Sequence, residues 1–260
     1  MGQKYFSKVF EPVSVLNTFH PESNVVVIGA SGGIGGALVD LLATDPRVAS
    51  LHAFCRSPDT WNRDRVKMGQ LDVTDESSIS AAAEATAASG PVDLVIVASG
   101  ILHRGPDIQP EKSLRELDPQ NLMTAFSINA VGPAMVAKYF LPHMRRDHKT
   151  VFAALSARVG SISDNRLGGW ASYRTSKAAL NMLLKTISIE HARQSPRSVI
   201  AGLHPGTVAT NLSSPFTSRV PDGRLFTPAM SAEYLLQVID TLEPADSGGL
   251  FAWNGERIEF

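Results

Sequence analysis

Hydrophobic residues along this chain gather in short runs, and the stretches between them mix apolar with polar positions. Runs such as "NVVVIGA" (24–30) and "TVFAALS" (150–156) have the length of buried strands. An alternation of strand and helix predicts a parallel sheet covered by helices on both faces. Strands are predicted over 24–30, 50–55, 66–73, 91–100, 150–156, 197–206 and 248–253, and helices over 33–43, 119–145, 170–193 and 228–242.

One further helix is expected after the strand at 66–73. Thr74 can cap it, with Asp75 and Glu76 in its first turn, where the helix dipole favours acids. No linker or repeat divides the chain, so the fold class is α/β: a single doubly wound Rossmann-type domain over 21–260, with a parallel sheet of about seven strands. Residues 1–20 are interpreted as an N-terminal extension.

Composition narrows the classes of partner. The 260 residues carry a formal charge of −1 and 43% hydrophobic content, which suits one large α/β domain or two small ones. A near-neutral charge gives no electrostatic reason to expect nucleic acid or an anionic membrane. No apolar run approaches the roughly 18 residues of a spanning helix. The lone Cys55 excludes an internal disulfide, and the start carries no secretory signal, so a cytoplasmic location is expected.

A glycine-rich turn follows the first strand. In "IGASGGIGGAL", Gly29, Gly33 and Gly35 let the turn adopt positive φ and let backbone amides approach a pyrophosphate. The helix that begins there offers unpaired N–H groups to an anion. Tight strand-to-helix turns use glycine in any case, but the strand–loop–helix context favours a dinucleotide site.

The end of the second strand bears on the choice of nucleotide. An acid there would bind the ribose hydroxyls of NAD and repel a 2′-phosphate. The chain reads "AFCRS" instead, and Arg56 can pair with a phosphate, which favours NADP; the alternative is an ordinary surface arginine. Asp72 ends the third strand, where it could meet adenine or serve only a local turn.

Tyr173 and Lys177 stand four residues apart in "GWASYRTSKAAL". On a helix this spacing puts both side chains on one face, roughly 6 Å apart. A fixed ammonium favours the phenolate and would lower the tyrosine pKa from its usual value near 10. The pair could then exchange protons near neutral pH, although the spacing also occurs on ordinary surface helices.

Together these motifs resemble the short-chain dehydrogenase/reductase family over nearly all of 24–260. The family's T-G-x3-G-x-G is present with Ile28 in place of threonine, its Y-x3-K is the pair just described, and its N-N-A-G is reduced to "VASG" (97–100). Its proline–glycine after the sixth strand is "HPGTVATN" (204–211). The closing stretch is most similar to the carbonyl-reductase and C-factor-like branch.

The resemblance assigns roles to individual residues. Tyr173 would be the general acid in reduction, and Lys177 would lower its pKa and bind the nicotinamide ribose. The cofactor-binding residues it implies are Gly29, Ser31, Gly33, Ile34, Gly35, Arg56, Asp72, Val73, Ala98, Ser99, Gly100, Tyr173, Lys177, Pro205, Gly206, Val208 and Thr210.

The family's serine is less easily placed. Counting back from Gly160 gives Ala157, whereas counting along the strand gives Ser156. Ser156 is preferred, because a hydroxyl is needed to hold the substrate carbonyl, and Ser161 is the alternative. No metal site is expected, since the histidines show no ligand spacing.

Asn129 matches the family's helix asparagine. Pro133 has no N–H, so the backbone carbonyl of Asn129 loses its helical partner and could hold a water that reaches Lys177. The alternative is that Gly132 and Pro133 only kink the helix.

The function expected is NADPH-dependent reduction of a small-molecule carbonyl compound, an aldehyde, ketone or quinone, with Asn129, Ser156, Tyr173 and Lys177 as the catalytic residues. Substrate choice is assigned to a lid over 211–227, where Phe216, Leu225 and Phe226 could form an apolar wall. The alternative is a non-enzymatic NADP-binding signalling protein of the C-factor type. A sugar-nucleotide epimerase is disfavoured by the short C-terminal part, and monomer, homodimer and homotetramer all stay open.

Overall fold

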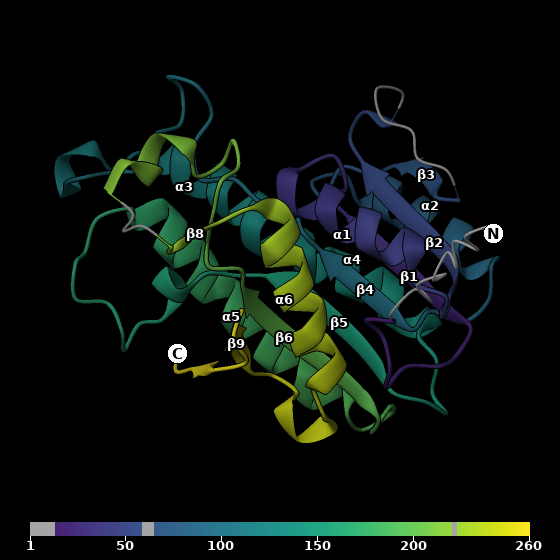
Figure 1. Cartoon of the computed structure of the whole chain (residues 1–260). Coiled ribbons are helices and arrows are strands. Elements are labelled where there is room, and N and C mark those ends of the chain that lie inside the picture. The colour runs from purple at the N-terminus through teal and green to yellow at the C-terminus, as the bar shows by residue number, and fades with distance from the viewer. Residues whose placement is uncertain (1–13, 59–64, 220–222) are drawn as a thin grey trace, which may run out of the picture.

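The computed structural model describes residues 14–58, 65–219 and 223–260. Its main sheet has eight strands (Figure 1). From one edge to the other they are β10 (Arg257–Ile258), β9 (Leu250–Ala252), β6 (Ser198–His204), β5 (Thr150–Leu155), β4 (Leu94–Val97), β1 (Ser23–Ile28), β2 (Val48–Cys55) and β3 (Lys67–Gln70). The expected parallel, doubly wound sheet is confirmed.

The main sheet has one strand more than the sequence predicted, and two short strands, β7 (Thr207–Val208) and β8 (Leu225–Phe226), form a separate two-stranded sheet. β10 is antiparallel to β9 and pairs through only two residues, Arg257 and Ile258. Asn254 and Gly255 stand in the connecting turn, and Gly255 has φ +81. A two-residue strand leaves too little alternation in the sequence to be read as a strand, although Asn–Gly is a common hairpin signal.

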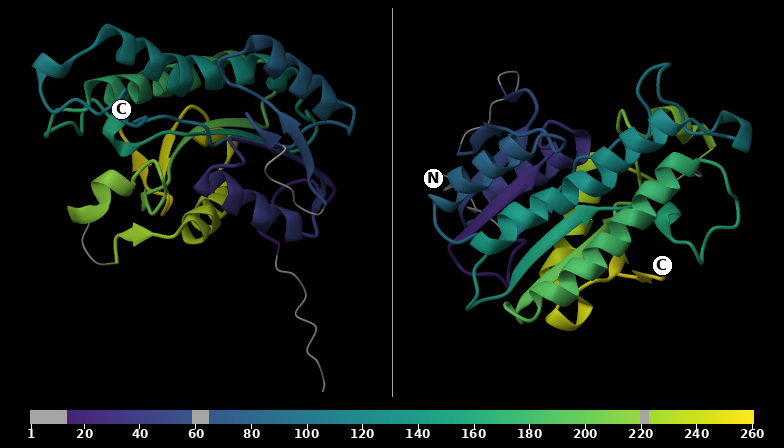
Figure 2. Two further views of the ribbon diagram at one scale, coloured as in Figure 1. Left: turned by 90° about the horizontal axis from the view of Figure 1, so that it is seen from above. Right: turned by 180° about the vertical axis from the view of Figure 1, so that it is seen from behind.

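Helices cover both faces of the sheet, as the two views of Figure 2 show. α1 (Gly33–Thr44) and α6 (Pro228–Thr241) lie on one face. The other face carries α2 (Glu76–Ala87), α4 (Gly132–Phe140) and α5 (Ala171–His191), with α3 (Pro119–Phe126) beside α5. Short 3-10 turns occupy Leu114–Glu116, Leu141–His143, Arg158–Gly160, Ser214–Arg219 and Pro244–Asp246.

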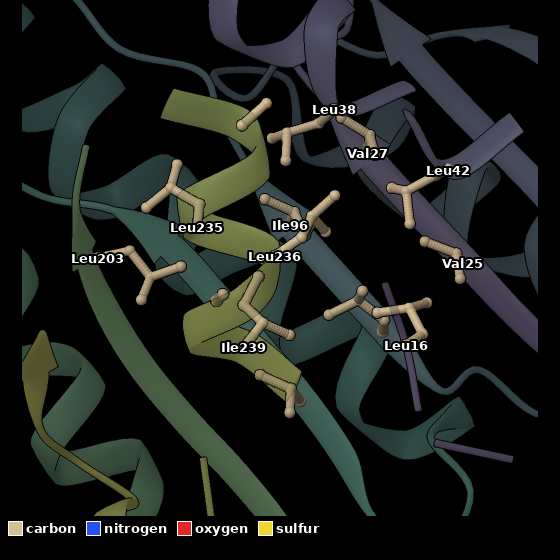
Figure 3. Packing of buried hydrophobic residues seen from close by; sticks show 14 of the residues in the cluster. Leu16, Val25, Val27, Leu38, Leu42, Ile96, Leu203, Leu235, Leu236 and Ile239 are labelled. Carbon is tan, nitrogen blue, oxygen red and sulfur yellow. The ribbon is translucent and has the colours of Figure 1, made fainter. Parts of the chain in front are cut away.

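The core has two layers, one on each side of the sheet. Along β1, Val25 and Val27 pack toward α1 and α6, whereas Val26 and Ile28 pack toward the opposite helices. A strand covered on both faces favours apolar residues on both sides, which explains the unbroken hydrophobic run from Val25 to Ile28. Figure 3 shows the first layer, where leucines of α1 and α6 meet the strands.

The described part of the N-terminal extension is docked on this first layer. Leu16 and Phe19 are buried, and the carboxylate of Asp45 accepts hydrogen bonds from the backbone N–H groups of Val15 (2.7 Å) and Leu16 (3.2 Å). Residues 14–20 therefore help to cover α1 and α6; residues 1–13 of the predicted extension lie outside the described residues.

Two local predictions need correction. Asp75, not Thr74, caps α2, because the Asp75 carboxylate accepts from the N–H of Ser77 while Thr74 bonds Asp72. The single helix expected over 119–145 is interrupted by a π-helical turn at Ser127–Val131 and ends at Phe140. The turn lies just before Pro133, which cannot donate the regular helical hydrogen bond.

Candidate functional site

The glycine turn after β1 is closed by backbone contacts that no side chain would permit. Gly29 has φ +86, and a Cβ there would lie 2.7 Å from the backbone nitrogen of Ser99 in the loop after β4. A Cβ on Gly35 would lie 2.1 Å from the carbonyl oxygen of Gly29. The β1 and β4 loops therefore touch at the sheet's switch point, where ligands of such folds bind.

The first turn of α1 is left open toward this loop. Gly32 is its N-cap and makes no side-chain capping hydrogen bond, so the first N–H groups of α1 receive no cap from it. A Cβ on Gly33 would lie 2.7 Å from Cγ2 of Thr210. Thr210, expected among the cofactor residues, thus reaches the glycine loop from a distant part of the chain.

A cleft of about 870 Å³ opens in front of the two loops. Of the expected cofactor residues, those that line it are Gly29, Ser31, Arg56, Asp72, Val73, Ala98, Ser99 and Gly100. Ile34 instead packs against the core, and Pro205, Gly206 and Val208 lie along the segment that leads from β6. Backbone open to an anion at a helix N-terminus fits a dinucleotide phosphate.

Arg56 and Asp72 stand at the part of the cleft formed by the ends of β2 and β3. Arg56 is exposed. The carboxylate of Asp72 accepts hydrogen bonds from the hydroxyl (2.7 Å) and the N–H (2.9 Å) of Thr74, and these bonds lower its pKa. Asp72 therefore serves the local turn, one of the two roles considered for it, while still facing the cleft.

Tyr173, which is half-buried, and Lys177, which is buried, lie on the same side of α5. Nζ of Lys177 donates to the carbonyl of Leu155 (2.7 Å) and lies 5.7 Å from the centre of the Tyr173 ring. A Cβ on Gly100 would be 3.7 Å from this Nζ, so the ammonium borders the cleft.

Burial controls the proton affinity of both groups. It lowers the pKa of Lys177 to about 8 and raises that of Tyr173 to about 12. The sequence predicted that Lys177 would bring the pKa of Tyr173 below 10; the pKa is raised instead, because burial disfavours the charged phenolate. The phenol therefore keeps its proton near neutral pH.

The side chain of Asn129 joins the loop after β4 to α5. It is fully buried, accepts from the N–H of Ile101 (2.8 Å), and donates to the Ile101 carbonyl (2.8 Å) and the Ser176 hydroxyl (3.0 Å). Asn129 thus braces the loop that walls the cleft. The water relay from its backbone carbonyl to Lys177 stays a prediction.

The two candidate serines are both buried and already hydrogen-bonded. Ser156 donates to Oδ1 of Asn181 (2.7 Å), and Ser161 lies 3.3 Å from the hydroxyl of Ser163. Ser156 would have to give up its bond to Asn181 in order to donate to a substrate. Its catalytic role stays a prediction, and this contact counts against it.

Sequence reasoning missed three residues that gather near Tyr173. The Trp170 ring lies 6.4 Å from the Tyr173 ring, Glu111 is buried and binds Ser172, and His103 joins this group through its contact with Phe216. Each stands in an irregular segment with no motif, so only the fold brings them together. Of the expected lid wall, Phe216 contacts Trp170, whereas Phe226 packs against Tyr234 and Trp253.

Two negative findings hold for the residues that the structure describes. None of their helices is both long enough and apolar enough to cross a membrane. Nor do three or more of their His, Cys, Asp or Glu side chains come together as a metal-ligand set.

Comparison with known proteins agrees with this geometry. The family model for short chain dehydrogenase matches residues 23–220. An uncharacterized oxidoreductase of Schizosaccharomyces pombe is 28% identical over 253 residues, covering 90% of this chain and 96% of the relative. The C-signal of Myxococcus xanthus is 34% identical over 170 residues, 65% of this chain and 93% of that protein.

A solved structure matches as well. The NADPH-bound carbonyl reductase from chicken fatty liver has a TM-score of 0.79 and 27% identity, and the match covers 92% of this chain and 100% of that one. The chain belongs to the short-chain dehydrogenase family and is an oxidoreductase of that type.

Proposed function

We propose that this oxidoreductase uses NADPH to reduce a carbonyl compound to an alcohol, with Tyr173 as the proton donor. The observation that carries the proposal is the position of Tyr173 and Lys177 on the same side of α5, with the Lys177 ammonium beside the cleft-lining Gly100. When bound, NADPH supplies the hydride; the chain supplies the proton and holds both molecules.

The residues around the cleft fit the dinucleotide. Gly29 and Gly35 let the backbone of this loop pack closely beside the cleft, and the uncapped start of α1 favours a phosphate. Strand β2 ends without an acid of its own, and Arg56 lines the cleft there; the carboxylate of Asp72, which interacts electrostatically with Arg56, is hydrogen-bonded to Thr74. We propose on this ground that NADPH is preferred over NADH.

Tyr173 and Lys177 divide the remaining work. A phenol with a pKa of about 12 carries its proton near neutral pH, so a proton is present for the substrate oxygen. Lys177, with a pKa of about 8, is mostly charged at pH 7 and can bind ribose hydroxyls and stabilise the phenolate left behind.

The test is NADPH oxidation with a panel of aldehydes, ketones and quinones. We expect at least one class to be reduced, with NADPH binding measured separately by fluorescence titration. NADPH binding without turnover of any panel member would contradict the proposal and favour the non-enzymatic alternative, which the likeness to the C-signal of Myxococcus xanthus keeps in view.

A further inference from the structure

Three aromatic side chains from distant segments meet beside Tyr173. The ring of Trp170 lies 6.4 Å from that of Tyr173 and 5.0 Å from that of Phe216, centre to centre. The ring of His103 lies 5.8 Å from that of Phe216. We propose that Trp170, Phe216 and His103, here called the aromatic wall, make Trp170 a specificity-determining residue for carbonyl substrates that carry an aromatic ring; this rests on the proposed function.

The backbone around Trp170 is built to present this one side chain. Gly168, Gly169 and Trp170 have φ of +62, +66 and +53 in succession. Glycine adopts this region freely, but a bulky residue rarely does, and such strained residues concentrate at functional sites. A third glycine or an asparagine would form this turn with less strain. We therefore infer that the tryptophan ring itself serves the site.

Glu111 fixes the strained segment from behind. Its backbone carbonyl accepts from the N–H of Trp170 (2.5 Å), and its buried carboxylate accepts from the N–H (3.2 Å) and the hydroxyl of Ser172. The same acid thus ties down the residues on both sides of Ala171. The position of the indole beside Tyr173 is therefore fixed by main-chain hydrogen bonds. The indole is only half-buried, so packing in the core does not fix it.

The chemistry of the wall selects one class of substrate. The wall consists of aromatic rings. Nε2 of the His103 ring already forms a hydrogen bond with the backbone carbonyl of Asn211 (3.0 Å). The wall contains no lysine or arginine that could pair with a carboxylate or phosphate. Aromatic pairs at centre distances of roughly 4.5–7 Å attract one another beyond the burial of their surface. An aryl carbonyl that reaches the Tyr173 hydroxyl would find such a partner in Trp170.

Two aldehydes, one with an aromatic ring and one with a saturated ring, test the inference. Benzaldehyde and cyclohexanecarbaldehyde have the same carbon skeleton, and Trp170→Phe and Trp170→Leu differ mainly in aromaticity. We expect Trp170→Leu to raise KM for benzaldehyde about fivefold to tenfold, with KM for the saturated aldehyde changing less than twofold. Trp170→Phe should restore most of the loss. Leu167→Ala, 92% exposed in the same loop, is the control and should change neither.

Equal effects of Trp170→Leu on both aldehydes, or no difference between the Phe and Leu variants, would overturn the inference while leaving the reductase activity in place. A second readout does not need turnover: binding of benzamide and cyclohexanecarboxamide to the NADPH-loaded protein by calorimetry. Tighter binding of benzamide that is lost in Trp170→Leu supports the aromatic wall even if no carbonyl is reduced, and equal affinities contradict it.

Discussion

One wall of the site is formed by backbone atoms and the other by side chains. The wall toward the glycine loop is main chain: Gly29 and Gly35 contact backbone atoms so closely that no Cβ fits. The wall toward Tyr173 is side chain, and its contacts join distant positions, with Glu111 and Ser172 61 residues apart and His103 and Asn211 108 apart.

This difference indicates that substrate specificity can vary more easily than cofactor binding. A cradle made of backbone depends little on the neighbouring side chains, so most substitutions around it should change phosphate binding little. A wall of side chains on irregular segments can change by single substitutions without touching the sheet. The predictions below test whether the two walls act as separately as their construction implies.

The largest effect should come from the side-chain wall. Tyr173→Phe keeps the ring and its contact with Trp170 but removes the proton, so we expect turnover to fall by roughly two to four orders of magnitude. NADPH affinity should stay within about threefold of wild type. Turnover and titration of the same preparation measure both. A variant that retains a third of wild-type turnover would show that another group donates the proton.

The backbone wall is tested by Gly35→Ala. A Cβ there would lie 2.1 Å from a main-chain oxygen, so the loop must open, and we expect NADPH to bind at least roughly a hundredfold more weakly, or the fold to lose stability. Gly32→Ala is the matched control, because its Cβ would lie 3.2 Å from the same oxygen and its φ is −76. Similar affinities of the two variants would refute the close-packed cradle.

Cofactor choice should respond to Arg56 alone. Removing its charge in Arg56→Ala should weaken NADPH binding by about tenfold to a hundredfold, the usual range for a charged hydrogen bond, and leave NADH binding nearly unchanged. Dissociation constants of both cofactors for wild type and variant measure this. Equal affinities in the wild type would remove the basis for an NADPH preference.

Cofactor affinity should also depend on pH through Lys177. Its pKa of about 8 means that the ammonium, mostly present at pH 7, is mostly lost at pH 9. If only the charged form binds the ribose, NADPH affinity should fall about tenfold over this interval. Lys177→Met should bind weakly at both pH values without that slope. A wild-type affinity that is flat from pH 7 to 9 would contradict the assignment.

The sequence predicted the backbone wall far better than the side-chain wall. The strand–helix alternation and the spacing of Gly29, Gly33 and Gly35 are local patterns, and the sheet follows from them. Tyr173 and Lys177 were visible because helical spacing is local too. Glu111 and Trp170 were not, since their meeting depends on how two long irregular segments cross.

Two incorrect predictions, for the pKa of Tyr173 and for an unbroken helix over 119–145, also arise because a local pattern does not show the tertiary surroundings. Burial raised the pKa of Tyr173, but the local spacing showed only the neighbouring ammonium. Likewise, the π-helical turn before Pro133 depends on a helix register that hydrophobic periodicity does not resolve.

The smallest effect on activity is expected for Ser156→Ala. The hydroxyl donates to Oδ1 of Asn181 inside the core, and Nδ2 of that amide has no hydrogen-bond partner among the described residues. Removing it leaves a buried acceptor unsatisfied, so the free energy of unfolding should fall by roughly 1–3 kcal/mol. Turnover should stay within about threefold, because a hydroxyl committed to the core is not available to the substrate.

Urea unfolding and steady-state kinetics on Ser156→Ala, with Ser161→Ala in parallel, measure both quantities. A hundredfold loss of turnover at unchanged stability would instead make Ser156 the group that holds the carbonyl, and would mean that its bond to Asn181 breaks when substrate binds.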